Sequence, residues 1–362
     1  MPDPPPLRVA LVAPPFIAVP PLRYGGTERV VAELAAALLG RGHQVTVFAS
    51  GDSTTPAELV PTEPVALWDT GSDEDRDVVL ARTVEVVAAA AIPGRFDVVH
   101  AHLDQAGLAL AARLPAGPPG PRLVHTIHQP MDGSDPRFRP GRGRLVALSE
   151  AQRAAAPSLD WIAVVPNGLD LAAMPFGRVP GDDLCFVGRI DRQKGPLEAI
   201  EIAGSSGRRL RVAARIGDLA SQQSYAESVF LPAARRADVE FLGELAPADR
   251  DRLLATSYAT LMPVRWPEPF GLVAVESLAC GTPVLAHALG ALPEIVRHGR
   301  DGFLGRDPAE LAGFVDAVAG LDRAAVRAGA LDRFGRDRMA VRYEAVYRRL
   351  LAEGDGRVSP ER

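Results

Sequence analysis

The sequence predicts an α/β protein built from two Rossmann-like units in tandem. Short apolar runs rich in β-branched residues alternate with longer segments of helical periodicity, which is the pattern of parallel sheets with crossover helices. This alternation of strand and helix patterns begins again at Asp183, after a junction near Pro166–Asp170. The chain has 362 residues, more than one hydrophobic core of about 150–200 residues normally accommodates. We therefore expect an N-terminal domain over residues 1–165, a C-terminal domain over 166–335 and a C-terminal segment over 336–362.

In the first unit, each predicted strand is a short apolar run bounded by turn residues. The first helix is expected to start at Thr27, whose side chain can cap the free N–H groups, and to stop at Gly40 or Gly42. The predicted strands are 8–14, 44–50, 96–101, 122–128, 144–149 and 161–168, and the predicted helices are 27–42, 77–91, 105–114 and a short one from Glu150.

The second unit repeats the alternation. The predicted strands are 183–190, 209–215, 239–243, 259–264 and 283–287, and the predicted helices are 196–204, 223–236, 247–257 and one that begins near Gly271 and ends at Gly281. From Pro308 onward the chain is helical in pattern and rich in arginine. Because ligands of open parallel sheets bind at the carboxyl ends of the strands, we expect a ligand in a cleft between two facing units.

Composition narrows the class of protein. The formal net charge of −5 gives no reason to expect a nucleic-acid partner. Cys185 and Cys280 are the only cysteines, which excludes a disulfide framework and a cysteine zinc site. The start of the chain lacks the pattern of a secretory signal, and no apolar run approaches the roughly 20 residues of a membrane span. A cytoplasmic protein is therefore expected, and no basic amphipathic helix supports peripheral contact with a membrane.

Two glutamates bracket the apolar segment EPFGLVAVE. Pro267 and Pro269 hold Glu268 in a loop, and a helix can begin near Gly271. Glu276 then lies on a helix with little polar surface, where a charge is costly unless hydrogen-bond donors meet it. The hydroxyl groups of an elongated ligand would suit both carboxylates, which would lie roughly 10 Å apart along the helix axis. The alternative is that Glu268 is a solvated loop residue and Glu276 pairs with an arginine.

The segment VGRIDRQKG, residues 187–195, follows the first strand of the second unit. Arg189 and Lys194 place two cations at a strand end, which suits a diphosphate. Lys194 is the only lysine among 40 basic residues, and this scarcity indicates a need for a compact ammonium group. The alternative is a solvated basic loop.

In the first unit, Gly25 and Gly26 precede a helix N-terminus, an arrangement that captures anions or hydroxyl groups, although a simple tight turn would have the same sequence. The dinucleotide fingerprint G-x-G-x-x-G is missing, which argues against a nicotinamide-dependent dehydrogenase. Among the histidines at strand ends, His128 is the best placed to reach a ligand. Zinc binding is not favoured, because no helical H-x-x-x-H pair appears.

Together these segments resemble one known family. E-P-F-G-L-x-x-x-E followed by A-C-G-T-P-V, with G-R-I-x-x-x-K-G upstream, is similar to the retaining glycosyltransferases of family 4, which have the GT-B fold of two Rossmann-like domains facing across a cleft. RYGGTERVVAELAAALLGRGHQVTVFASG, DVVHAH, VVPNGLD and LPEIVRHGRDGFL match the family as well. The resemblance covers nearly the whole chain, and the segment MAVRYEAVYRRLL resembles the C-terminal helix that crosses back to the first domain.

The resemblance implies a role for each matching residue. Arg189 and Lys194 would neutralise the diphosphate of the donor, so that no divalent metal ion is needed. Glu268 would hold the donor sugar and Glu276 the ribose hydroxyls, while His128 would lie at the reacting face of the sugar. Further contacts would come from the backbone of Gly25, Gly26, Leu245, Phe270, Gly271 and Leu272.

The implied reaction is transfer of a hexosyl group, with retention of configuration and without a cofactor. The donor would be a nucleoside diphosphate sugar of the UDP-glucose or GDP-mannose type, and the unidentified acceptor a small molecule, a glycan or a lipid. Domain closure would hinge near Pro166–Asp170. Two alternatives remain open: a GT-B epimerase or phosphorylase-like enzyme, and a non-catalytic protein that binds nucleotide sugars. An epimerase would turn over the donor without a second substrate, and a phosphorylase would depend on free phosphate.

Overall fold

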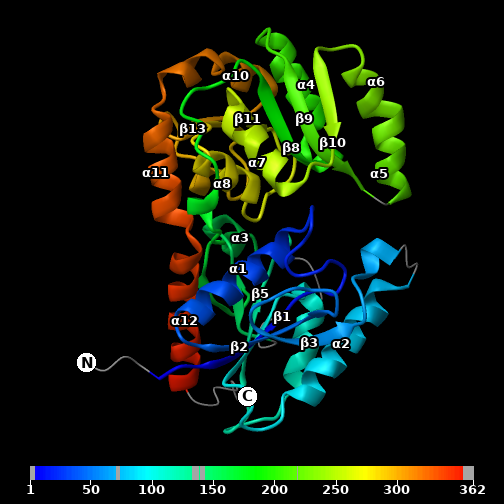
Figure 1. Ribbon diagram of the computed structural model, residues 1–362, viewed down its shortest axis with the longest axis vertical. Helices are drawn as coiled ribbons and strands as arrows, with labels where there is room; N and C mark the ends of the chain where they lie inside the picture. The colour runs from blue at the N-terminus through cyan, green and yellow to red at the C-terminus, as the bar shows by residue number, and fades with distance from the viewer. Residues whose placement is uncertain (1–4, 71–73, 133–137, 139–142, 218, 354–362) are drawn as a thin grey trace. The chain divides into compact units, whose positions relative to one another are not determined.

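The chain forms two compact units, which Figure 1 colours along the sequence. The computed structural model describes residues 5–70, 74–132, 138, 143–217 and 219–353. The first unit contains Met1–Pro21, Gly25–Leu169 and Arg336–Arg362, and the second contains Leu22–Tyr24 and Asp170–Gly335. Each unit has the parallel sheet flanked by helices that the alternating sequence pattern predicts.

The first unit is organised around a seven-stranded sheet in the order β3-β2-β1-β4-β5-β6-β7, with every neighbouring pair parallel. The strand order reverses between β1 and β4. The strands are β1 (Arg8–Val12), β2 (Gln44–Ser50), β3 (Glu58–Glu63), β4 (Val98–Ala101), β5 (Arg122–Thr126), β6 (Leu145–Ala147) and β7 (Trp161–Val164), and the helices are α1 (Gly26–Gly40), α2 (Arg76–Ala90), α3 (Glu150–Ala155) and α12 (Arg336–Ala352).

The side chains of β4 lie alternately on the two faces of this sheet, because successive side chains of a strand point in opposite directions. Val99 and Ala101 belong to the apolar cluster that α2 completes. His100 points to the other face, where its Nδ1 lies 2.7 Å from the hydroxyl oxygen of Tyr347 on α12. Figure 1 shows α12 beside α1, and the two helices are in contact. Helix α12 is therefore part of the first unit.

The second unit has a six-stranded sheet in the order β10-β9-β8-β11-β12-β13, again parallel throughout. Here the order reverses between β8 and β11. The strands are β8 (Leu184–Ile190), β9 (Leu210–Ile216), β10 (Val239–Gly243), β11 (Ala259–Met262), β12 (Val284–His287) and β13 (Gly302–Gly305). The helices are α4 (Pro196–Ser205), α5 (Ala220–Tyr225), α6 (Leu231–Ala234), α7 (Pro247–Thr256), α8 (Leu272–Ala279), α9 (Leu292–Ile295), α10 (Pro308–Gly313) and α11 (Arg323–Phe334).

Three predicted helices differ from the structure. Helix α1 begins at Gly26 with Gly25 as its N-cap, and Thr27 makes no capping hydrogen bond. The segment predicted as a helix over 105–114 is a 3₁₀ helix over Asp104–Ala112. It starts from a left-handed backbone at Asp104, with φ of 47°, which prevents a regular α-helical start.

The helix predicted over 223–236 is interrupted. It starts at Ala220 and has a π-helical turn over Ala226–Phe230 between α5 and α6. Pro232 has no N–H to donate to the carbonyl of Ser228, so the α-helical ladder lacks one bond at this point. Within the described residues, no helix combines the length and the apolar character needed to cross a bilayer.

Candidate functional site

The reversal of strand order in the second unit brings several predicted site residues to one edge of its sheet. Arg189 is the next-to-last residue of β8, and Lys194 follows in a 3₁₀ turn over Arg192–Lys194. Glu268 lies in the loop after β11, the neighbour of β8 on the other side of the reversal. In open parallel sheets, ligands bind at the carboxyl ends of the strands next to such a reversal. The second unit therefore has its candidate site here.

Lys194 and Glu268 form an ion pair in this loop region. The Nζ atom of Lys194 donates to Oε2 of Glu268 at 2.6 Å, and the indole Nε1 of Trp266 donates to the same oxygen at 2.8 Å. The ammonium group also lies 4.6 Å from the centroid of the Trp266 ring, within reach of a cation–π interaction. Glu268 is only 8% exposed, so it is not a solvated loop residue. The structure thus places in direct contact two charged residues that belong to separate sequence motifs.

The backbone around Gly195 positions Lys194. Gly195 has a left-handed φ of 74°, and a Cβ atom at this residue would lie 2.0 Å from the carbonyl oxygen of Pro263. Only glycine allows the two loops to approach this closely. The N–H of Arg265 donates to the carbonyl of Gln193 at 2.7 Å, which fastens the loop after β8 to the loop after β11.

Arg189 is the second cation at this edge. Its Nη2 atom lies 3.4 Å from Oδ2 of Asp191, beyond good hydrogen-bonding distance. Its Nε atom is buried without a hydrogen-bond partner among the described residues. A buried N–H group normally has a partner, so the guanidinium group has unused capacity to bind an anion.

The N-terminus of α8 adds backbone donors next to Glu268. Gly271 is the N-cap, and its carbonyl accepts the N–H of Ala274 at 3.0 Å, so the N–H groups of Phe270, Gly271 and Leu272 precede the first bonded turn. The carbonyl of Glu268 accepts the N–H of Ala291 at 2.8 Å. This bond ties the glutamate loop to the segment that follows β12.

Glu276 lies on α8 and is only 2% exposed. Its Oε1 atom is 3.1 Å from Nη2 of Arg250 on α7, and the same guanidinium group contacts Asp251 at 2.8 Å. Glu276 therefore pairs with an arginine, which is the alternative that the sequence left open. Leu245 is half-buried in the turn between β10 and α7, at the same carboxyl edge of the sheet.

The first unit has its own group of polar residues where its strand order reverses. Gly25 and Gly26 join the loop after β1 to α1, and a Cβ atom on Gly25 would lie 2.7 Å from Cβ of Pro21. Glu28 in the first turn of α1 is 6% exposed, and burial raises its pKa to about 7. The guanidinium group of Arg76 acts against that rise.

Asp104 follows β4 at the same edge. Its Oδ1 atom accepts the backbone N–H of His128 at 2.8 Å. Burial raises the pKa of Asp104 to about 6, although this hydrogen bond, those from Gln129 and the charge of Arg76 lower it. The sequence motifs did not single out Asp104 or Glu28. The usable signal was their position near a topological reversal, Asp104 after β4 and Glu28 in the first turn of the helix that follows β1.

His128 lies just past β5 and belongs to a row of neutral histidines. Its Nε2 atom is 2.8 Å from Nδ1 of His102, and burial lowers its pKa to about 4. Burial and neighbouring imidazoles hold the pKa of His102 well below its usual value. The His100 ring lies against that of His102, with centroids 4.1 Å apart and planes tilted by 37°, and its Nε2 atom is 2.7 Å from the hydroxyl oxygen of Thr126. Across the described ranges, no cluster of three or more histidine, cysteine or acidic residues has the arrangement of a metal site.

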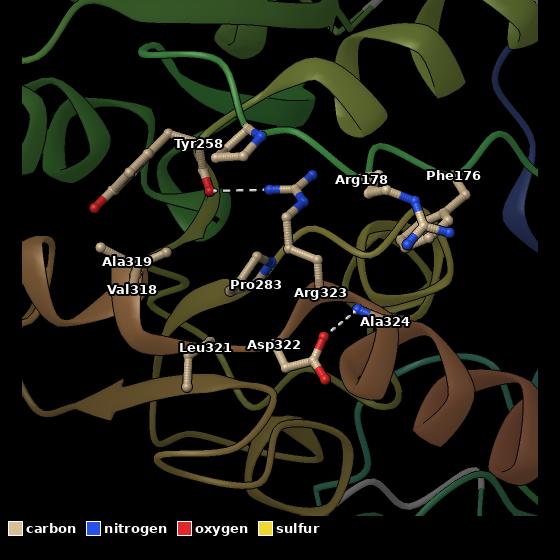
Figure 2. A pocket seen from close by; sticks show the side chains of 11 residues that line it. Phe176, Arg178, Tyr258, Pro283, Val318, Ala319, Leu321, Asp322, Arg323 and Ala324 are labelled. Atoms are coloured by element: carbon tan, nitrogen blue, oxygen red, sulfur yellow. Dashed lines mark hydrogen bonds between the residues drawn. The ribbon is translucent and has the colours of Figure 1, made fainter.

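A separate cavity of about 280 Å³ lies at the opposite edge of the second sheet. Figure 2 shows it between the segments that precede β11 and β12, with Tyr258 and Pro283 in its wall. The buried guanidinium group of Arg323 points to backbone carbonyls there, including those of Ser257 at 3.1 Å and Ala255 at 2.9 Å. Arg323 therefore supplies hydrogen-bond donors to backbone carbonyl groups at this edge of the sheet. The paired charges of Lys194 and Glu268 lie at the other edge.

Comparison with known proteins gives consistent matches over both units. The family model described as glycosyl transferases group 1 matches residues 179–321, and the model described as glycosyltransferase family 4 matches residues 24–173. The chain is 32% identical over 349 residues to the D-inositol 3-phosphate glycosyltransferase of Frankia alni, a match that covers 81% of this chain and 86% of that protein.

Solved structures agree with this result. The chain is similar to AviGT4, a glycosyltransferase involved in avilamycin A biosynthesis, with 31% identity, a TM-score of 0.72 and coverage of 96% of this chain and 98% of that one. It is also similar in fold to the sucrose-phosphate synthase of Thermosynechococcus elongatus, with 20% identity, a TM-score of 0.75 and coverage of 96% and 100%. The GT-B fold expected from the sequence is confirmed.

Proposed function

Because this chain belongs to the family 4 glycosyltransferases, we propose that it transfers a hexosyl group from a nucleoside diphosphate sugar to an acceptor, with retention of configuration and without a divalent metal ion. The donor is of the UDP-glucose or GDP-mannose type, and no cofactor takes part. One observation carries the proposal: Arg189 and the ion pair of Lys194 with Glu268 lie together at the reversal point of the second sheet.

The two cations have the largest electrostatic task in this reaction. When the bond between the sugar and the diphosphate breaks, negative charge develops on the departing phosphate oxygens. Arg189 and Lys194 stabilise that charge in place of a metal ion, because preorganised positive groups act strongly at a site shielded from water. Lys194 forms an ion pair with Glu268 in the structure. In the proposed complex, the Lys194 ammonium group therefore contacts both the Glu268 carboxylate and the diphosphate of the donor.

The remaining donor contacts follow from the chemistry of each position. Glu268 accepts hydrogen bonds from sugar hydroxyl groups, and the backbone N–H groups of Phe270, Gly271 and Leu272 donate to sugar or phosphate oxygens. Glu276 accepts from the ribose hydroxyls while Arg250 keeps its charge compensated. The backbone at Leu245 contacts the base.

The transfer step needs no carboxylate nucleophile. The bond from the anomeric carbon to the leaving phosphate oxygen breaks while the acceptor oxygen bonds to that carbon on the same face. The acceptor proton passes to the leaving phosphate oxygen, so charge and atoms balance. From the first unit, the proposal assigns His128 to the reacting face of the sugar, and Gly25 and Gly26 to the phosphates or the acceptor.

The test is a donor and acceptor panel with the purified full chain. UDP-glucose and GDP-mannose are each incubated with small alcohols, glycans, lipid acceptors and D-inositol 3-phosphate, the acceptor that the name of the Frankia alni relative gives. Mass spectrometry detects products, and proton NMR reads the anomeric configuration of the new bond. Transfer with retention in the presence of EDTA is expected.

Other outcomes would favour the alternatives. Conversion of the donor without any second substrate would indicate an epimerase, and dependence on free phosphate would indicate a phosphorylase-like enzyme. Donor binding without even slow hydrolysis or transfer would indicate a binding protein. An inverted product, or a loss of activity with EDTA that Mg²⁺ restores, would contradict the retaining or metal-independent part of the proposal.

A further inference from the structure

His128 is contacted by two residues that follow β4. Asp104 accepts the backbone N–H of His128 at 2.8 Å, and reaches it from a left-handed backbone that non-glycine residues seldom adopt. His102 contacts the far ring nitrogen, with its Nδ1 atom 2.8 Å from Nε2 of His128. The first contact fixes the backbone of His128, and the second fixes its imidazole ring.

The contact between the two histidines requires a choice of proton position. Both rings are neutral near pH 7, because burial lowers the pKa of His128 to about 4 and that of His102 well below its usual value. Between two neutral rings, one nitrogen donates and the other accepts. Either His102 donates from Nδ1 and His128 carries its proton on Nδ1, or His128 donates from Nε2 and its Nδ1 is a lone pair.

One feature favours the first arrangement. Nε2 of His102 is buried and has no hydrogen-bond partner among the described residues. The second arrangement would place a hydrogen on that atom and leave a buried N–H group without an acceptor, which folded proteins rarely tolerate.

We propose that His102 donates from Nδ1 to Nε2 of His128 and thereby holds His128 as the Nδ1–H tautomer, which offers a ligand a hydrogen-bond donor and no basic nitrogen. His102 is a positioning residue that acts through His128. The tautomer follows from the contacts within the first unit. Its consequence for transfer rests on the proposed function: His128 donates to an oxygen of the sugar, and the acceptor proton must go elsewhere, to the leaving phosphate.

The direct test is nitrogen NMR of the full chain labelled with ¹⁵N-histidine at pH 7.5. The signals of His128 are assigned by their loss in His128→Asn. We expect Nδ1 of His128 at a protonated shift and Nε2 at an unprotonated, hydrogen-bonded shift. A protonated Nε2 in the unaltered protein would overturn the inference.

A matched pair of variants tests the cause. His102→Phe keeps a ring against His100 but removes the donor, so the nitrogen shifts of His128 should move toward the opposite tautomer. His125→Phe is the control, since His125 is also buried and both its ring nitrogens have no partner within the described part of the chain. Unchanged His128 shifts in His102→Phe, or equal changes in both variants, would show that His102 does not set the tautomer.

Kinetics separate this inference from the proposed function. With the donor found in the panel, His102→Phe should lower kcat by about tenfold or more, whereas the affinity for UDP or GDP should not change. His102→Asn, whose amide N–H can take the place of Nδ1–H, should recover part of the loss. A shifted tautomer with unaltered turnover would remove His128 from the transfer step and would leave its protonation state as inferred.

Discussion

Replacement of Lys194 by alanine is the most informative perturbation of the second unit. The ammonium group donates to Glu268 at 2.6 Å, and the Lys194 side chain is 22% exposed against 10% for that of Glu268. Lys194→Ala therefore removes one of the two proposed diphosphate cations and leaves a mostly buried carboxylate with the indole N–H of Trp266 at 2.8 Å. Both changes oppose the binding of a dianionic ligand at this edge.

The expected magnitude follows from these contacts. A hydrogen bond between charged groups contributes about 1.5–3 kcal/mol, and each 1.4 kcal/mol changes Kd by about tenfold. UDP or GDP should therefore bind about 10- to 150-fold more weakly to Lys194→Ala. Repulsion from the uncompensated Glu268 carboxylate places the result toward the upper end of that range. The double variant Lys194→Ala/Glu268→Gln lacks this repulsion and should bind the nucleotide more tightly than Lys194→Ala alone.

Isothermal titration calorimetry with UDP and with GDP measures these affinities, and thermal unfolding checks that each variant is folded. Arg192→Ala is the matched control, because Arg192 lies in the same turn but is exposed, with its guanidinium group 4.8 Å from the centroid of the Tyr225 ring. An affinity of Lys194→Ala within twofold of the unaltered protein, or an equal loss in Arg192→Ala, would refute the assignment of Lys194 to the diphosphate.

The other predictions concern catalysis, pH and packing. Glu268→Gln keeps the shape of the side chain but removes the charge that we propose holds the donor sugar, so kcat should fall by about 100-fold in the transfer assay; unaltered turnover would exclude that role. Burial raises the pKa of Glu28 from 4.5 to about 7, so the folded protein keeps this proton where the unfolded chain loses it, and stability falls as the pH rises through that interval. Relative to the unaltered protein, Glu28→Gln should therefore gain up to about 3 kcal/mol in unfolding free energy between pH 5 and pH 8 in urea titrations, and a pH-independent difference would contradict the raised pKa. Gly195→Ala should lower the unfolding free energy by about 3 kcal/mol or more, since its Cβ atom would meet Pro263, whereas Gly207→Ala, which has a similar φ of 66° and no neighbour within 4 Å, should cost only about 1 kcal/mol.

The sequence predicted site residues best where a charged residue is unusual for its surroundings. The lone lysine and the two glutamates of the EPFGLVAVE segment are charges in apolar or glycine-rich surroundings, and each lies at the carboxyl edge of the second sheet. The direct contact between Lys194 and Glu268 could not be predicted, because it depends on how closely Gly195 approaches Pro263. A single sequence does not encode that distance in any local pattern.

The two strands missing from the prediction are both at sheet edges. β3 and β13 each pair on one side only, so they need less apolar sequence than the central strands. The segment of β3, ELVPTE, contains a proline and two glutamates, which local propensity assigns to a loop. Asp104 was missed for a different reason, since its left-handed backbone is fixed by tertiary contacts such as the bond to His128.

The position of α12 has a consequence for synthesis of the chain. Tyr343 and Tyr347 are fully buried in the first unit, where the Tyr343 hydroxyl lies 2.8 Å from that of Thr126 and the Tyr347 hydroxyl 2.7 Å from His100. A ribosome makes these tyrosines only after every residue of the second unit has been translated. The half of the protein that is begun first is thus finished last, and a nascent chain released before α12 should lose the native packing of its N-terminal half while its C-terminal half can still form.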